Sequence, residues 1–358
     1  MKSRSELLRE AKKQAVVARK PLRNAPFRPF RDDILKHFVR FHYWKRRINR
    51  LMRAREIQSV AYFSLCADTA FDARLFKQEE LIDFKVQRPI PFAFCEYDPD
   101  RYDLLTRVFP SPCQGFFGRL EEIATDVGNE VYSKFWGSFP YDVINLDFWG
   151  DIHKAHHPTH NVFYAISAIV SQQAPLIKPY ELWITWRAKP DRVELQIRDE
   201  YKGIISQNLK QVESFKERFE EVHKNINPNR LSTEDLVNIG FIKWLLFIAN
   251  RSFSVIEEPE ILLYTREDKD GKKYQLINFL LRIRPYEHVV MPSPAGQAAS
   301  SCQDSYEENA AICFQEPIDV DEQYRLLPEK QKATLKKNLI QLNEQFENDK
   351  AGYLGRAL

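Results

Sequence analysis

The sequence predicts an α/β protein with a mostly parallel sheet, and three observations support this fold class. Short apolar runs lie at 59–65, 91–96, 141–147 and 180–186, and the first three carry a polar or acidic residue at or next to their end. Helical stretches separate these runs, and a repeated strand-helix order gives parallel strands joined by crossovers. Two long apolar segments flank a turn signal at 267–272, which predicts a closing antiparallel hairpin.

The ends of the predicted strands carry polar side chains. Ser64 lies at the end of the first run, Glu96 ends the second and Asp147 ends the run at 141–147. Ligands of open α/β sheets bind at the carboxyl ends of the strands. We therefore expect the functional site near these three residues.

Helix signals lie between the strands. A cap of the form Asp-Pro-Asp opens the stretch 98–109, and Ser232 precedes acidic residues at the start of the stretch 232–249. Two further helical patterns cover 159–174 and 193–223. These segments supply the crossovers that a parallel sheet requires.

Composition excludes several classes of protein. The 358 residues are 44% hydrophobic and 29% charged, as in ordinary globular domains, and the 11 glycines argue against a chain rich in phosphate-binding loops. The five cysteines form no CxxC pair, so we expect neither a disulfide framework nor a structural metal site. No P-loop and no GxSxG motif occurs. Without a signal-peptide pattern or a long apolar run, we expect a soluble, cytoplasmic protein.

Positive charge is concentrated at the amino terminus. Residues 1–55 contain 18 Lys/Arg against four Asp/Glu, whereas the whole chain carries only +3. Apolar residues recur at helical spacing over 32–55, which predicts one amphipathic helix with Lys36, Arg40, Arg47 and Arg50 on its outer face. The candidate nucleic-acid ligands are Arg40, Lys45, Arg46, Arg47 and Arg50.

Three interpretations of this basic face stay open. Lys and Arg near phosphates release counterions, and interleaved aromatic rings could stack on unpaired bases, which favours nucleic acid. The face could instead bind an anionic protein partner. It could also be a solvated surface whose aromatic residues belong to the core.

Composition divides the chain into four parts. We expect a basic helical extension over 1–56, an α/β domain over 57–288, a flexible acidic linker over 289–327 and a carboxyl-terminal helix over 328–358. The last helix has leucines and a phenylalanine at helical spacing, so we expect it to dock on the domain or on a partner.

This layout resembles that of the class I S-adenosylmethionine-dependent methyltransferases, whose Rossmann-like, seven-stranded, mostly parallel sheet ends in such a hairpin. The resemblance covers about 32–285. More narrowly, the pattern Ile34-Leu35-Lys36-His37-Phe38 with Trp44, followed by the strand around Tyr62, is similar to the three-Cys-motif partner proteins of bacteria. That likeness implies a setting in a bacterial defence or mobile-element cassette.

The turn after the first strand departs from the family pattern. Asp68 and Ala70 stand where the family has glycines, and Ser64 stands where it has an acidic residue. A Cβ at a tight turn resists positive φ and narrows the space for a ligand. The resemblance implies cofactor contacts from Ser64, Asp68 and Glu96, in a degenerate S-adenosylmethionine site.

Other positions keep the family's chemistry. Glu96 could hold ribose hydroxyls, since a carboxylate accepts two hydrogen bonds, or it could be a turn acid ahead of Asp98. The resemblance places substrate or catalytic residues at Asp147, Trp149 and Asp151, where amino-methyltransferases hold the target nitrogen. The next segment, 153–160, contains four histidines that could form a solvated loop, transfer protons, contact phosphate or bind metal.

Two functions follow from these observations. The chain could be a methyltransferase-like protein with a degenerate cofactor site that acts on or binds nucleic acid. Alternatively, it could be an active S-adenosylmethionine-dependent methyltransferase that uses Glu96 and Asp147. The altered turn favours the first function, and the acids at the strand ends favour the second.

Overall fold

The structure is a computed structural model. It describes residues 33–66, 69–87, 89–148, 152, 161–173, 178–188, 193, 195–223, 227, 230–252, 254–267, 272–285 and 317–354. Within these ranges, no helix combines the length and the apolar character needed to cross a membrane.

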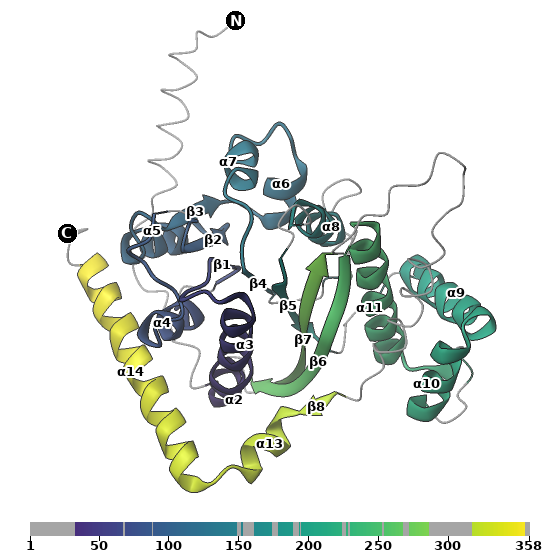
Figure 1. Ribbon diagram of the computed structural model, residues 1–358. Helices are drawn as coiled ribbons and strands as arrows, with labels where there is room; N and C mark the ends of the chain where they lie inside the picture. The colour runs from purple at the N-terminus through teal and green to yellow at the C-terminus, as the bar shows by residue number, and fades with distance from the viewer. Residues whose placement is uncertain are drawn as a thin grey trace, which may run out of the picture. The chain divides into compact units, whose positions relative to one another are not determined.

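An eight-stranded sheet forms the centre of the described chain, in the order β3-β2-β1-β4-β5-β7-β6-β8 (Figure 1). The strands are β1 Tyr62–Ser64, β2 Phe92–Glu96, β3 Gln114–Phe117, β4 Val143–Asp147, β5 Tyr180–Arg187, β6 Ser254–Glu267, β7 Lys273–Pro285 and β8 Ile318–Asp319. The first five strands are parallel, and β7 is antiparallel to both β5 and β6. This arrangement confirms the α/β class and the closing antiparallel pair.

The number of strands differs from the predicted seven. The short strand β8 pairs in parallel with β6, and α13 (Val320–Leu326) follows it directly. Both elements fall within 289–327, so the predicted linker is wrong for its last residues. Val320 is fully buried, which explains why a segment of acidic composition is nevertheless attached to the sheet.

Helices cover both faces of the sheet. On one face, Tyr62 of β1 packs on Phe76 of α4 (Phe71–Gln78), and Trp183 of β5 stacks on Trp44 at a centroid distance of 5.3 Å. On the other face, Trp186 packs at 4.4 Å against Phe241 of α11 (Thr233–Arg251). Successive side chains of a strand point to opposite faces, so each strand contributes to both layers.

The remaining helices connect the strands or extend the two layers. They are α5 Pro99–Val108, α6 Leu120–Thr125, α7 Tyr132–Trp136, α8 Val162–Gln173, α9 Leu195–Gln211 and α10 Glu213–His223. The pattern predicted as one helix over 193–223 is therefore two helices. The predicted cap residues are confirmed: Asp98 accepts from the backbone N–H groups of Asp100 and Arg101, and Ser232 accepts from that of Asp235.

One continuous helix precedes the sheet and packs on it. It consists of α2 (Ile34–Phe38), a π-helical segment η1 (Val39–Trp44) and α3 (Lys45–Arg55). The Trp44 indole N–H donates to Asn278 of β7 at 2.9 Å, which links the helix to a strand 234 residues later in the chain.

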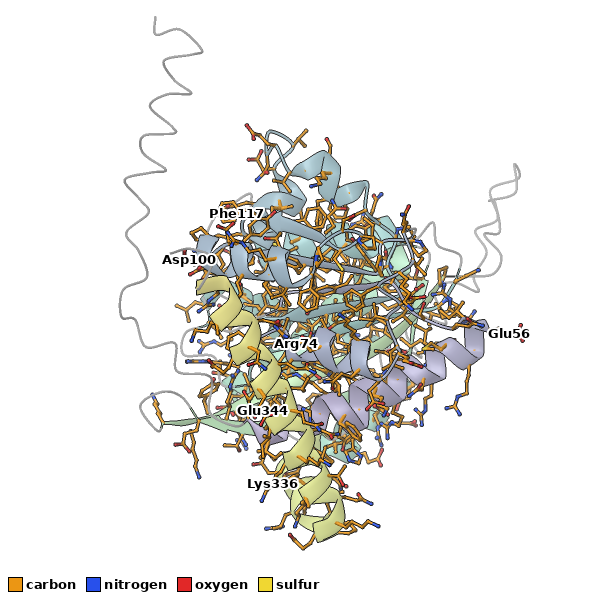
Figure 2. The ribbon with its side chains drawn as sticks, turned by 90° about the vertical axis from the view of Figure 1, so that its left-hand side faces the viewer. Glu56, Arg74, Asp100, Phe117, Lys336 and Glu344 are labelled. Atoms are coloured by element: carbon orange, nitrogen blue, oxygen red, sulfur yellow. The ribbon has the colours of Figure 1, made fainter. Side chains whose placement is uncertain are left out.

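The carboxyl-terminal helix α14 (Glu329–Leu354) packs on α2, α4 and α5. Figure 2 shows α14 crossing the molecule with Arg74 beneath it, and the Arg74 guanidinium donates to Asp349 at 2.5 Å. One side of the helix is buried through Leu335, Leu339, Leu342 and Phe346.

Candidate functional site

A buried polar cluster occupies the carboxyl end of β1. The Asp72 carboxylate, from the first turn of α4, accepts from the Tyr62 hydroxyl at 2.5 Å, from the Ser64 hydroxyl at 2.9 Å and from the Asn145 amide at 3.2 Å. The Asn145 amide also donates to the Tyr62 hydroxyl at 2.9 Å. A carboxylate thus lies at this strand end although the strand itself ends in Ser64.

This cluster has little accessible surface. Tyr62, Ser64 and Asn145 are fully buried, and Asp72 is 5% exposed. Its bonds tie β1 to β4 and to α4, so Ser64 has a structural role. The Oδ1 atom of Asn145 is nevertheless buried without a partner among the described residues. An acceptor of this kind normally bonds a donor, from protein, water or ligand.

The turn between β1 and α4 has a backbone that favours glycine. Ala70, the residue before α4, has φ 40° and ψ 43°, in the left-handed region, and it is buried. The Thr69 carbonyl accepts from Arg74 Nε at 2.8 Å, which holds the turn in place. The turn conformation that a glycine would adopt is therefore present without the glycine. Asp68 lies outside the described residues.

Glu96 ends β2 and closes a local turn. Its carboxylate accepts from the backbone N–H of Asp98 at 2.8 Å, as the turn interpretation expects. Burial raises the pKa of Glu96, and this backbone N–H partly opposes the shift. The next residue, Tyr97, is 58% exposed and carries the Arg119 guanidinium 5.0 Å from its ring centroid.

Asp147 forms an ion pair with the buried Lys36 of α2. Burial lowers the pKa of Lys36, and the Asp147 carboxylate opposes that shift. The same carboxylate helps burial to raise the pKa of Tyr264, whose hydroxyl has no hydrogen-bond partner among the described residues. Asp147 therefore fastens α2 to the end of β4. The other predicted catalytic residues, Trp149 and Asp151, and the histidines of 153–160 lie outside the described residues.

The basic helix differs from the predicted pattern at two cations. Lys36 is 4% exposed, and Arg47 is fully buried, where its Nε donates to Glu181 at 2.5 Å. Neither lies on the outer face, so Arg47 is excluded as a nucleic-acid ligand. Glu181 also accepts from Arg282 at 2.9 Å, which completes a buried ionic cluster under α3.

The other predicted ligands lie at or near the surface of this helix. Arg46 donates to both carboxylate oxygens of Glu260, at 2.7 and 2.8 Å, and Arg50 lies 3.9 Å from the same carboxylate. Lys45 pairs with Glu79 at 2.5 Å. The Arg40 guanidinium lies 5.7 Å from the ring centroid of Phe71.

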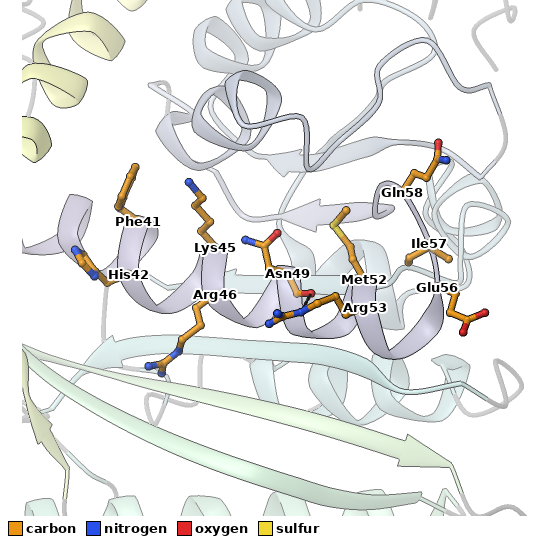
Figure 3. A pocket seen from close by; sticks show the side chains of 10 residues that line it. All are labelled: Phe41, His42, Lys45, Arg46, Asn49, Met52, Arg53, Glu56, Ile57 and Gln58. Carbon is orange, nitrogen blue, oxygen red and sulfur yellow. Dashed lines mark hydrogen bonds between the residues drawn. The ribbon is translucent and has the colours of Figure 1, made fainter.

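An open groove runs along the outer side of η1 and α3, with a volume of about 750 Å³ (Figure 3). Three cations, one carboxylate and several apolar side chains line it. The lining residues are Phe41, His42, Lys45, Arg46, Asn49, Met52, Arg53, Glu56, Ile57 and Gln58. Predicted ligands Lys45 and Arg46 thus share one surface with Arg53, which sequence analysis did not select.

Sequence analysis did not assign the two residues that contact the strand ends, because it did not name Asp72 and it placed Lys36 on the outer face of the helix. Asp72 is an acidic residue in the first turn of the helix after β1, and this position is the only sequence signal that it gives. Lys36 interrupts an apolar pattern at 34–38, which could have marked it as a buried cation. Both depend on partners elsewhere in the chain, since Asp147 is 111 residues from Lys36.

A comparison with protein-family models identifies a related family. The model described as PP_RS20740-like covers residues 114–350, about two thirds of the 358-residue chain. The chain belongs to the PP_RS20740-like family. In this PP_RS20740-like protein, the matched region runs from β3 into α14, and the groove on α3 precedes it. No curated protein matches the sequence significantly.

Solved structures give distant similarities. A candidate RNA methyltransferase from Pyrococcus horikoshii has 12% identity and a TM-score of 0.31, with 67% of this chain and 82% of that chain covered. A protein from work on the conversion of a disulfide bond into a thioacetal group in echinomycin biosynthesis has 11% identity and a TM-score of 0.31, over 68% and 82%. An S-adenosylmethionine-dependent methyltransferase from Anabaena variabilis has 10% identity and a TM-score of 0.23, over 71% and 96%.

Proposed function

We propose that this chain is a methyltransferase-fold protein that binds nucleic acid through the groove on η1 and α3, and that its cofactor site is degenerate. One observation carries the proposal. Lys45, Arg46 and Arg53 line the groove against one carboxylate, Glu56, together with Phe41 and other apolar side chains. Cations beside a partly exposed aromatic ring are the combination that phosphates and bases require.

The existing ion pairs do not prevent such binding. Arg46 is 42% exposed at its side chain, and its partner Glu260 is 20% exposed. The pair is partly exposed, and a phosphate can form the same bidentate bonds to the guanidinium, so a phosphate can replace Glu260. Arg53 donates to the Asn49 carbonyl at 3.3 Å, and no carboxylate pairs with it in the described part of the chain.

The strand ends support the degenerate part of the proposal. The Ser64 hydroxyl already donates to Asp72, and Asp147 already forms an ion pair with Lys36. Catalysis by Asp147 would require release of a buried lysine, which costs several kcal/mol if the lysine stays charged. The proposed setting in a defence or mobile-element cassette, and a protein partner within it, rest on the resemblance to the three-Cys-motif partner proteins alone.

The test is fluorescence anisotropy with labelled DNA and RNA oligonucleotides over a range of salt concentrations. We expect Arg46→Glu with Arg53→Glu to weaken binding at least tenfold and to reduce the salt slope by about 1 to 2 units, because each lost phosphate contact removes counterion release. Arg218→Glu on α10 is the control, since Arg218 is also partly exposed and pairs with a glutamate, Glu221. Unchanged affinity and slope in the double variant would refute the proposal.

A second function, active methyl transfer, is favoured by the Oδ1 atom of Asn145, which has no hydrogen-bond partner among the described residues, and by the left-handed Ala70. S-adenosylmethionine would supply the methyl group when bound. Glu96 would accept from the ribose hydroxyls, and Asp72 with Asn145 would face the ammonium group. Asp147 would then hold the acceptor only after separation from Lys36.

Calorimetric titration with S-adenosylmethionine and S-adenosylhomocysteine tests this second function. Binding that is lost in Glu96→Ala but kept in Asp103→Ala, a change in α5 away from the strand end, would establish the cofactor site. Absence of binding to the wild-type protein would leave the degenerate site as the better description.

A further inference from the structure

We infer that the groove on η1 and α3 selects single-stranded nucleic acid over duplex. This inference rests on the proposed function and adds the class of ligand. It depends on three properties of the groove: its course along one side of one helix, its apolar lining and its low charge.

The groove follows one side of one helix. Its lining residues recur every three or four positions from Phe41 to Glu56, and Figure 3 shows Phe41, Lys45 and Asn49 in a row on the same side. Lys45 and Arg53 are eight residues apart in α3, which is about 12 Å at the rise of an α-helix. Two phosphates of one strand can reach these two positions.

Apolar side chains separate and flank the cations. Phe41, Met52 and Ile57 line the groove and are only partly buried. The Lys45 ammonium lies 4.5 Å from the ring centroid of Phe41, so a charge and an aromatic surface are presented together. A single strand offers base faces to such a lining, whereas a duplex hides its bases in the stack and presents its phosphate backbone.

The charge of the groove is low for a duplex ligand. Three cations and one carboxylate, Glu56, line it, and Lys45 and Arg46 already pair with Glu79 and Glu260. Burial, with Arg46 and Lys45 nearby, lowers the pKa of His42, so its imidazole is neutral at pH 7 and adds no charge. Duplex-binding proteins commonly contact about 6–10 phosphates, more than this surface can serve. The groove therefore fits a short single-stranded segment.

The position of the groove agrees with a binding role. The π-helical segment η1 contains Phe41 and His42, and it buries Val39, Tyr43 and Trp44 against the protein. Single π turns within helices are frequent at functional sites. Here the segment leaves one ring and one imidazole at the groove while Val39, Tyr43 and Trp44 enter the core.

The experiment compares a labelled 12-nucleotide single strand, as DNA and as RNA, with the blunt duplex of the same sequence, on the full chain. We expect the single strand to bind at least tenfold more tightly at 150 mM salt. Its salt slope should be about −2, since three phosphate contacts at about −0.7 each give this value.

Two variants test the role of the ring. Phe41→Ala should weaken single-strand binding about five- to 150-fold, which corresponds to the 1–3 kcal/mol of one stacked base, and should leave duplex binding unchanged. Phe41→Leu keeps the apolar volume and the fold but removes the ring, and it should lose most of the same affinity. The matched control is Phe247→Ala, because Phe247 is an exposed ring with the Arg251 guanidinium 5.3 Å from its centroid.

The possible results separate the inference from the proposed function. If the wild-type protein binds neither ligand, both fail. If duplex binds as tightly as single strand, or if Phe41→Leu and Phe41→Ala bind single strand like the wild type, the inference is overturned while nucleic-acid binding stands. Preference for the single strand together with loss in both variants supports the inference.

Discussion

A buried histidine on α2 makes the stability of the protein depend on pH. His37 is fully buried, neither ring nitrogen has a partner among the described residues, and burial with the nearby Arg40 charge lowers its pKa to about 3. In the unfolded chain the same imidazole titrates near pH 6.5. Below about pH 6.5 the unfolded state binds a proton that the folded state does not bind. The free energy of unfolding therefore decreases as the pH falls towards 3.

His37→Leu should remove this dependence. Between pH 7.5 and pH 5.0, we expect the wild type to lose about 2 kcal/mol of unfolding free energy relative to the variant. Urea unfolding at the two pH values measures the difference. If the two proteins lose the same amount, His37 titrates normally in the folded state and the proposed cause is wrong.

The turn before α4 stores strain in a single residue. Left-handed backbone costs a residue with a Cβ about 1–2 kcal/mol, and Ala70 has φ 40°. Ala70→Gly should therefore raise the unfolding free energy by up to about 1 kcal/mol, once the greater freedom of glycine in the unfolded chain is subtracted. Ala73→Gly, inside α4, is the contrasting variant and should lose about 1 kcal/mol. Destabilisation by both changes would contradict the assigned strain.

The sequence predicted individual residues well where their role was local. The cap residues Asp98 and Ser232 need only the next few backbone N–H groups, and the structure has them as predicted. Lys36 and Arg47 were placed on the outer face because a helical wheel assigns sides by spacing alone. Their partners, Asp147 and Glu181, lie more than a hundred residues away in the sequence. The π-helical segment between Lys36 and Arg47 also changes the angle between these two side chains around the helix.

At the scale of elements, α14 completes the packing around the turn after β1. Phe346 is 1% exposed, its ring lies 6.4 Å from that of Phe71, and the Arg74 guanidinium lies 5.9 Å from it. Arg74 in turn holds Thr69. The carboxyl-terminal helix therefore contacts the residues next to this turn, which the methyltransferase resemblance assigns to the cofactor.

Phe346→Ala should destabilise the protein by about 3–5 kcal/mol, the usual cost of removing a buried phenyl ring. Ile340→Ala on the same helix is the matched control and should change stability by less than about 0.5 kcal/mol, because Ile340 is 56% exposed. Chemical denaturation of both variants provides the measurement. Equal effects would mean that α14 does not dock as described.

Element prediction succeeded for long or strongly apolar segments. The strand at 180–186 and the antiparallel pair at the end of the sheet are present, because their apolar runs are long. The short strands β3 and β8 were not identified: β3 has four residues, two of them only half-buried, and β8 has two. Pairing with β2 and with β6, not local pattern, makes these segments strands.

At the scale of the whole molecule, the amino-terminal helix belongs to the α/β unit. Trp44, Ile48 and Leu51 are fully buried. Native-state hydrogen exchange should give the amides of Ile48 and Leu51 the same opening free energy as those of Ile144 in β4, since such packing can open only by global unfolding. Exchange of α3 by local opening, several kcal/mol below β4, would show instead that the helix is a separable extension.

The candidate site was the least predictable part of the molecule as a whole. Sequence analysis brought Ser64, Glu96 and Asp147 to one edge of the sheet, because parallel strands end there. It could not show that the Ser64 hydroxyl would donate to Asp72, or that Asp147 would form an ion pair with Lys36. Such contacts arise only when the crossovers are folded, and no local pattern encodes them.

The contacts of Trp44 and Arg74 also bear on synthesis at the ribosome. After Trp44 is synthesised, 234 more residues must be added before its partner Asn278 exists, and Asp349 follows Arg74 by 275 residues. Translation proceeds at about 5–20 residues per second, so each early segment stays without its partner for roughly ten seconds or more after it emerges. The aromatic surface of the first helix is exposed during that interval, when a chaperone or a neighbouring nascent chain can reach it.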